Sequence, residues 1–267
     1  MNIAELVASR ELLWNLTLRE LRSRYKRSAL GWVWSTLNPL ATMAIFTVVF
    51  SVILDLESPA GSPSGMNSYP LYLLCGLLPW TFFAAAIAGS MGNVIGNAGL
   101  VKKVYFAREV LVLSAVGSAI VTMAVEMGLL TIVFVIAGNW QVVLWLPILA
   151  VILLLLAVFA SGIGLGLSAL NVYFRDVSYL WTVVAQAWFY ITPIIYPLSL
   201  VEKRPTLKLL VNLNPMAAFV SAIRDVMYDL RWPPLWRMGF LLGAAVCSAL
   251  VGLALFQRLS PHFAEEL

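Results

Sequence analysis

Long charge-free stretches, separated by short groups of charged residues, form the main pattern of this chain. These stretches cover residues 28–54, 58–101, 127–174, 177–201 and 238–257. A helix needs about 20 apolar residues to cross the hydrocarbon core of a bilayer. The pattern therefore predicts an all-α integral membrane protein with six transmembrane helices. We place these helices at residues 30–54, 70–92, 110–137, 143–170, 178–196 and 237–257.

Proline, glycine and small residues add detail to this arrangement. Pro39 is expected to bend the first span, because proline removes one hydrogen bond from a helix. The stretch 92–99 is rich in glycine and is expected to break the helix after the second span. The fourth span carries small residues over 161–168, which are typical of closely packed membrane helices.

The N-terminal residues 1–28 are predicted to form a unit of their own. Over 10–27, apolar side chains fall on one side of an expected helix and basic side chains on the other. The apolar side consists of Trp14, Leu18, Leu21 and Tyr25, and the basic side of Arg19, Arg22, Lys26 and Arg27. Such a helix lies in the headgroup plane of a membrane. We expect a cytoplasmic amphipathic interface helix over 1–28, followed by a transmembrane domain over 29–267.

Residues 198–236 are too polar to span the bilayer and too apolar for an ordinary loop. Leucines cluster over 207–213, and apolar residues then recur at helical spacing from Met216 to Ile223. This pattern predicts two short re-entrant helices before the last span. Irregular backbone at membrane depth is tolerated where protein covers it or a wet cavity faces it. We therefore place the segment at the outer mouth of a pore.

Composition supports a membrane protein and sets its orientation. Hydrophobic residues make up 61% of the chain and charged residues only 11%, against about a quarter in soluble proteins. The net charge of +4 does not indicate a nucleic-acid partner, because the cations lie at membrane boundaries. Eleven lysines and arginines lie in the segments of one side, at positions 10, 19, 22, 24, 26, 27, 102, 103, 108, 175 and 258. The other side carries six, all within 203–237. Basic residues favour the cytoplasmic side, so we expect both termini to be cytoplasmic and the membrane to be the cytoplasmic (inner) one.

Several kinds of chemistry have no residues to support them in this chain. No Gly-Lys pair is present, so there is no phosphate-binding P-loop. One histidine, His262, and two cysteines in apolar stretches, Cys75 and Cys247, do not make a zinc site. We therefore predict no catalytic residue, no metal and no cofactor in this chain. Glu126 is the one charged residue that the pattern places deep in the membrane, where it serves either a function or a helix contact.

An ordered set of motifs resembles the membrane-spanning permease subunits of polysaccharide and polyol-phosphate ABC exporters, of the type-2 ABC exporter family. The motifs are Arg22–Trp34 with Leu37–Leu40, Gly76–Phe83, Leu100–Glu109, Asn171–Val177, Phe189–Pro197, Asn214-Pro215 and Phe263–Glu265. They follow one another along nearly the whole chain. One departure is Ala107, where many members of the family have proline.

The resemblance implies a function and a set of partners. Members export lipid-linked polysaccharides such as O-antigen, galactan or teichoic-acid-like polymers. The resemblance implies a homodimer that works with two copies of a cytoplasmic ABC ATPase, which binds ATP and Mg²⁺. The chain itself is then a transport subunit and not an enzyme. Two alternatives stay open: the same architecture exporting a drug or small amphiphile, and an integral-membrane lipid or sugar transferase.

Three groups of residues are candidates for this function. The cytoplasmic loop 93–109 combines glycines, lysines and aromatic residues, which suit a docking element, and the loop after the fourth span is a second candidate contact. The predicted ATPase-docking residues are Asn97, Leu100, Lys102, Lys103, Tyr105, Phe106, Arg108, Arg175 and Asp176. The cations expected to guide an anionic lipid headgroup are Arg22, Arg24, Lys26 and Arg27. Aromatic rings stack on sugars as well as on the membrane interface, and the predicted channel-lining residues are Trp34, Phe82, Phe83, Tyr190 and Tyr196.

Overall fold

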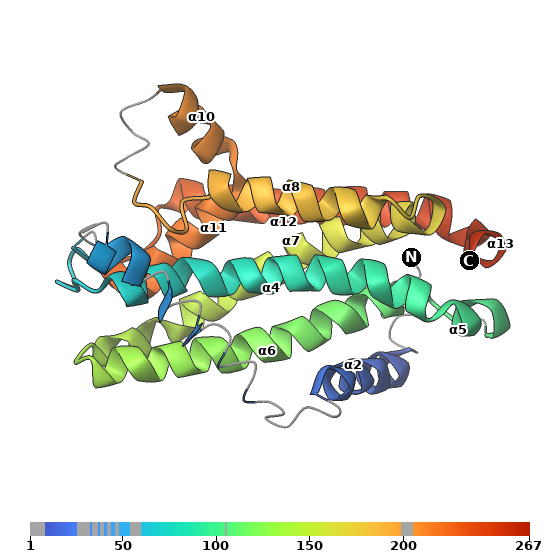
Figure 1. The fold of residues 1–267 in the computed structure, drawn as a ribbon, viewed down its shortest axis with the longest axis horizontal. Coiled ribbons are helices and arrows are strands. Elements are labelled where there is room, and N and C mark those ends of the chain that lie inside the picture. Colours follow the sequence, from blue (N-terminus) through green and yellow to red (C-terminus); the bar gives the residue numbers. More distant parts are fainter. Residues whose placement is uncertain are drawn as a thin grey trace.

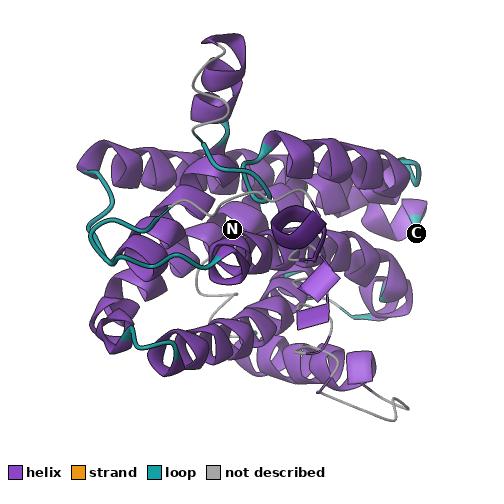
Figure 2. Cartoon of the chain, turned by 60° about the vertical axis from the view of Figure 1, so that its left-hand side comes forward, coloured by secondary structure: helices purple, strands orange, loops and turns teal. Residues whose placement is uncertain are grey.

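The protein is a bundle of long helices that run side by side along one axis (Figure 1). The computed structural model describes residues 9–25, 33, 37, 40–41, 44–45, 48–53, 60–104, 106–198 and 205–267. Within these residues the chain is helix and loop, without a strand (Figure 2). The predicted all-α class is confirmed for this part of the chain.

Four helices are long and apolar enough to cross a membrane. They are α4 (Tyr69–Gly96), α6 (Glu109–Ile136), α7 (Leu146–Tyr173, preceded by the 3₁₀ turn η2, Trp140–Trp145) and α12 (Leu235–Leu259). They correspond to the second, third, fourth and sixth predicted spans. The chain is therefore a multi-pass membrane protein.

The two other predicted spans have different outcomes. The first, 30–54, falls mostly outside the described residues, apart from short pieces such as the π-helix η1 (Val48–Ile53). The fifth is the helix α8 (Val177–Ile191), which has 15 residues and ends earlier than expected. At 1.5 Å per residue it is about 22 Å long, less than the bilayer core. Its end at Thr192 has a physical reason, because the residue before a proline favours extended backbone.

The break predicted over 92–99 lies at a single residue instead. Helix α4 continues through Gly92 and Gly96, and the next helix, α5 (Ala98–Lys103), begins two residues later. The glycines face open space, so they neither break the helix nor permit a close contact. The turn occurs at Asn97, whose backbone N–H bonds to the carbonyls of Asn93 and Ile95.

Helix α4 lies at the centre of the bundle. In its 18-residue apolar stretch, 78% of the residues are buried, whereas the share is 33% or less in the other long helices. It packs against α6 and α7, and against α11 (Pro215–Arg224) at one end. Helices α7 and α12 make the closest approach, because Gly162 lies against Ser248 and Gly252 of α12. The small residues predicted to permit close packing in the fourth span are confirmed in this role.

The segment before the last span forms two short helices. Helix α10 (Pro205–Leu213) and helix α11, which continues as η3 (Asp225–Asp229), meet at an angle of 84°. Asn214 at the corner accepts hydrogen bonds from Met216 N and Trp188 Nε1, and donates one to Thr192 Oγ1 at 2.9 Å. Helix α11 is buried, whereas α10 projects from the bundle (Figure 1). The two helices are confirmed, and their position in the outer leaflet stays a prediction.

The N-terminal helix α2 (Arg10–Tyr25) packs against the beginning of α6. Its buried side chains are Leu16, Thr17 and Leu21, whereas Trp14 is 62% exposed. Trp14 and Leu21 therefore do not share the side that packs on α6, and the predicted membrane-surface orientation of the helix stays a prediction. Gly117 of α6 has no side chain, which leaves room for Thr17.

Candidate functional site

The helices α2, α5 and α13 (Phe263–Glu266) gather at one end of the bundle (Figure 1). This end has an apolar cluster of its own, separate from the main core. Leu16 of α2, Val101 of α5 and Phe263 of α13 are all buried in it, together with residues of α4 and α6. We call this region the docking end, since it carries the predicted docking residues.

Helix α5 presents lysines on an anchored support. Val101 is 4% exposed, whereas Lys102 and Lys103 that follow it are exposed. Their position in the last turn of the helix is favourable, because the carboxyl end of a helix attracts cations. Leu100 is half-buried against the apolar cluster. The side chains that anchor α5 and those that it offers to a partner thus lie on different faces.

The segment after α5 is held by the C-terminal helix. Phe106 packs against the apolar cluster of the docking end. The guanidinium of Arg108 lies 5.9 Å from the ring centre of Phe263, within the range of a cation–π contact. Tyr105, another predicted docking residue, lies outside the described residues.

The second predicted contact lies at the same end. Arg175 and Asp176 form the turn between α7 and α8, and both are exposed. The turn is fixed by Ser178, whose hydroxyl donates to the Arg175 carbonyl at 3.0 Å and whose N–H donates to Asn171 Oδ1. The structure therefore brings both predicted docking segments to one end of the bundle (Figure 1).

The predicted headgroup cations are described only in part. Arg22 lies on α2 and is exposed. Arg24 lies in the same helix, and its side chain is outside the description. Lys26 and Arg27 lie outside the described residues. A role of these four residues toward lipid stays a prediction.

The predicted channel aromatics fall into buried and exposed residues. Phe83 has no exposed surface and stacks on Phe159, with ring centres 5.6 Å apart. Phe82 is 3% exposed. Tyr190 is 60% exposed on α8, and the Tyr196 hydroxyl donates to its carbonyl at 3.0 Å. Trp34, the fifth predicted residue, lies outside the described residues. Among the four described residues of this set, Tyr190 has the most exposed side chain, so its ring is available to a partner or a substrate.

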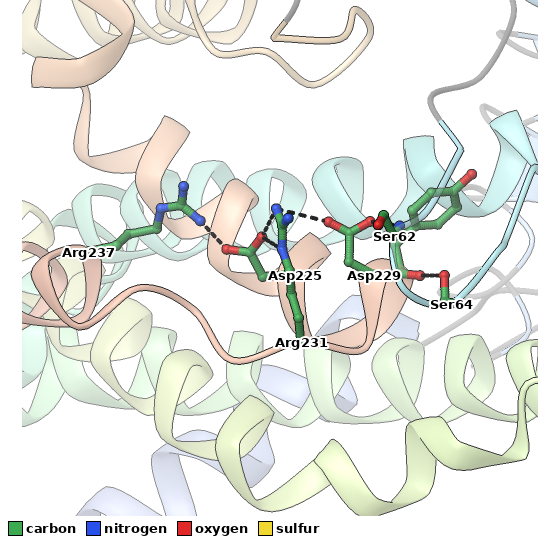
Figure 3. Close-up of polar contacts among 7 residues, drawn as sticks. Ser62, Ser64, Asp225, Asp229, Arg231 and Arg237 are labelled. Atoms are coloured by element: carbon green, nitrogen blue, oxygen red, sulfur yellow. Dashed lines mark hydrogen bonds and ion pairs between the residues drawn. The ribbon is translucent and has the colours of Figure 1, made fainter.

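A charged cluster joins η3 to the beginning of α12 (Figure 3), at the α11 end of the bundle and away from α5 and α13 (Figure 1). The Asp225 side chain is 3% exposed and accepts hydrogen bonds from Arg231 and Arg237. Asp229 pairs with Arg231 at 3.1 Å and accepts from the Ser62 N–H at 3.3 Å. Burial lowers the pKa of Arg231, but the hydrogen bond to Asp225 and the charges of Asp225 and Asp229 together outweigh this effect and raise the pKa.

Arg224, next to Asp225, is also buried. Its guanidinium donates to the carbonyls of Pro193 and Ile194, at 2.6 and 2.7 Å, and to that of Tyr72. It lies 3.6 Å from the ring centre of Tyr72. This one side chain therefore joins α11 to the beginning of α4 and to the segment after α8.

The sequence pattern did not lead us to predict a role for these two residues. Arg224 and Asp225 are 5% and 2% exposed, so they are charged residues buried within the protein. The signal was available, because an Arg-Asp pair interrupts an apolar helical segment between Pro215 and Met227. A cavity of 280 Å³ lies beside the cluster. Protein donors already bond to its carboxylates, which favours a structural tie over a ligand site.

Glu126 lies on α6 and lines a small cavity of 90 Å³ between α4 and α6. Thr81, Phe82 and Thr122 line the same cavity. Within the described part of the chain, no group of histidine, cysteine, aspartate or glutamate has the arrangement of a metal site.

The fold and these sites define a multi-pass helical membrane protein with exposed cationic segments at one end and a buried charged tie at the other. Residues 11–228 match the family model described as ABC-2 type transporter, and the chain belongs to this family.

Known relatives cover nearly the whole chain. The O-antigen export system permease protein RfbA of Myxococcus xanthus is 28% identical over 266 residues, which cover 99% of this chain and 98% of the relative. A protein of the same name from Klebsiella pneumoniae is 29% identical over 262 residues, or 96% and 95% of the two chains. The polysialic acid transport protein KpsM of Escherichia coli is 25% identical over 247 residues, or 91% of each.

Proposed function

We propose that this chain is the permease subunit of an ATP-driven exporter that moves a lipid-linked polysaccharide across the cytoplasmic membrane. The observation that carries the proposal is the similarity, over nearly the whole length, to permeases named for O-antigen export and polysialic acid transport. The structure supports it with an anchored cationic helix, α5, that is suited to contact an energy-supplying partner.

The assembly that we propose is a homodimer of this chain with two copies of a cytoplasmic ABC ATPase. ATP and Mg²⁺ bind to the ATPase, and this chain supplies transport without catalysis. Both termini and the docking end face the cytoplasm, in keeping with the basic residues there. The interface helix over 1–28 and the transmembrane domain over 29–267 act as its two units. Two copies of the bundle provide the helices needed to enclose a channel as wide as a sugar chain.

The proposed cycle begins at the cytoplasmic surface. The cations of α2, with Arg22 as the described example, attract the phosphate of the lipid carrier. Nucleotide-driven movement of the ATPase displaces α5, and the turn with Arg175 and Asp176 forms the second contact. The polymer passes exposed aromatic rings such as Tyr190. The outer segment, held by Asp225, gates the exit.

Charge reversal of α5 tests the docking part of this proposal. The variant Lys102→Glu with Lys103→Glu replaces two cations by anions at the proposed contact with the ATPase. Export is therefore expected to fall, while the chain still folds because both side chains are exposed. Lys208→Glu, on the exposed helix α10, is the matched control. Surface polysaccharide on the native host and ATP hydrolysis by the purified complex are measured together. Wild-type coupling of hydrolysis to export in the double variant would refute the docking role.

A further inference from the structure

The turn between α4 and α5 carries a chain of side-chain hydrogen bonds. Asn97 donates through Nδ2 to the carbonyl oxygen of Asn93 at 2.7 Å and to its Oδ1 at 2.9 Å. Asn93 is buried and donates in turn to the Leu111 carbonyl and to Ser114 Oγ, both on α6. This chain connects the turn before α5 to the interior of the bundle.

These bonds fix the direction of the Asn97 amide. The amide NH₂ group is used toward Asn93, so the oxygen Oδ1 points the other way, as the hydrogen-bond network requires. There it accepts a hydrogen bond of 2.6 Å from Nη2 of Arg19 on α2. A charged donor makes this a stronger bond than one between neutral groups.

Arg19 therefore differs from the other cations of the basic block. The sequence places it on the lipid-facing basic side of α2, together with Arg22. In the structure it instead joins α2 to the turn that begins the docking helix. Leu16 of α2 and Val101 of α5 are also buried in the same apolar cluster, so both helices rest on a common support.

We propose that Arg19 is a positioning residue that makes α2 and α5 move as one body during transport. A displacement of α5 then turns α2 in the headgroup plane, together with the cations that attract the lipid carrier. This inference rests on the proposed docking role of α5, and it adds that the same movement reaches the substrate's point of access. A hydrogen bond directed at one fixed oxygen suits this task, because it sets the rotation of α2 about its axis as well as its distance.

The first test compares Arg19→Ala and Arg19→Lys with Arg10→Ala, an exposed arginine of the same helix as matched control. In Arg19→Ala we expect the ATPase still to co-purify and to hydrolyse ATP, while surface polysaccharide on the native host falls several-fold, the size expected for one exposed hydrogen bond from a charged donor. Arg19→Lys restores most of the export, because lysine keeps a charged donor. Export in Arg19→Ala equal to that in Arg10→Ala would overturn the proposal. Loss of the ATPase from the Arg19→Ala complex would also overturn it, since Arg19 would then belong to the docking contact.

A second test uses a covalent link in place of the hydrogen bond. Arg19→Cys and Asn97→Cys are combined in a Cys247→Ala background, because Cys247 is the exposed native cysteine of the described chain. Bridging the pair with a short bis-maleimide is expected to restore export above that of the untreated variant. No recovery would mean that the two helices must separate during transport. The two proposals can fail separately. If ATP hydrolysis stays coupled to export in the Lys102→Glu, Lys103→Glu variant but not in Arg19→Ala, the docking role of the lysines is rejected and the role of Arg19 is kept.

Discussion

Buried polar side chains connect the ends of the helices in this protein. Arg224 donates to three backbone carbonyls, those of Tyr72, Pro193 and Ile194, and Asp225 pairs with two arginines from the following loop and helix. The sequence shows the Arg-Asp pair but not its partners, because Tyr72 and Pro193 lie 152 and 31 residues away from Arg224 along the chain. Such pairings depend on how the helices pack, and a pattern of hydrophobicity does not contain that information.

Replacing Arg224 with lysine tests its role as a tie. A lysine has one ammonium group and cannot reach the carbonyls of Tyr72, Pro193 and Ile194 together. We expect the variant to lose about 2–4 kcal/mol of unfolding free energy, since hydrogen bonds to charged groups contribute about 1.5–3 kcal/mol each. Arg258→Lys is the control, because Arg258 is exposed in the last turn of α12, and it should change stability little. Thermal unfolding in detergent measures both, and equal midpoints would contradict the assigned role.

Alanine variants of Phe83 and Tyr190 distinguish a core aromatic residue from a candidate channel residue. Phe83→Ala is expected to lower stability by about 3–5 kcal/mol, because it leaves a cavity in a closely packed aromatic cluster. Tyr190→Ala is expected to leave assembly intact and to reduce export, since its ring is exposed. Trp140→Ala, with a similarly exposed ring, is the control. Surface polysaccharide and the yield of folded protein are the two measurements. Unchanged export in Tyr190→Ala would make Tyr190 part of the aromatic interface belt.

At the level of helices, the pattern of hydrophobicity locates elements better than it locates their ends. Four predicted spans appear as long helices, but the break expected at the glycines occurs at Asn97, and α8 ends before its predicted limit. Glycine weakens a helix without ending it, whereas Asn97 and Thr192-Pro193 provide specific terminal geometry. The packing of α2 on α6 cannot be read from the hydrophobic pattern of α2, because the partner surface, with its space at Gly117, belongs to another helix.

The contact between α7 and α12 depends on glycine at Gly162. A methyl group there would overlap the backbone of Ser248, so Gly162→Ala is expected to destabilise the fold by about 1–3 kcal/mol, as overpacking does. Gly243→Ala on α12 is a matched control, because nothing lies near its added methyl group. Alanine favours a helix more than glycine does, so the control should be neutral or stabilising. The folded fraction in size-exclusion chromatography reports both, and equal values would contradict this packing.

The segment formed by α10, α11 and η3 is expected to depend on the Asp225 tie. Asp225→Asn keeps the shape of the side chain and removes the charge that Arg231 and Arg237 share. Breaking a buried ion pair typically costs about 3–5 kcal/mol, so we expect the segment to loosen. Proteoliposomes with the variant complex should leak a small sugar several-fold faster than the wild type. Glu266→Gln, at the docking end, is the control, and a wild-type leak rate in Asp225→Asn would argue against gating by this segment.

The two ends of the whole molecule divide the work that we propose for it. Residues from α2, α5, α13 and the turn after α7 lie at one end, and the α10–α11 segment lies at the other (Figure 1). The predicted topology agrees with this separation, because it places the segments of the first end on one side of the membrane and residues 198–236 on the other. The hydrogen bond between Arg19 and Asn97 could not be predicted from the positions of basic residues, since it depends on the direction of one amide group.

The most direct measurement of the central claim is the location of the polysaccharide in the native host after this gene is removed. We predict that surface polysaccharide disappears and that lipid-linked polymer accumulates inside the cell. The wild-type chain should restore the surface polymer, and the Lys102→Glu, Lys103→Glu variant should not. A full amount of surface polysaccharide in the absence of the chain, with none accumulating inside, would contradict its role as the export permease.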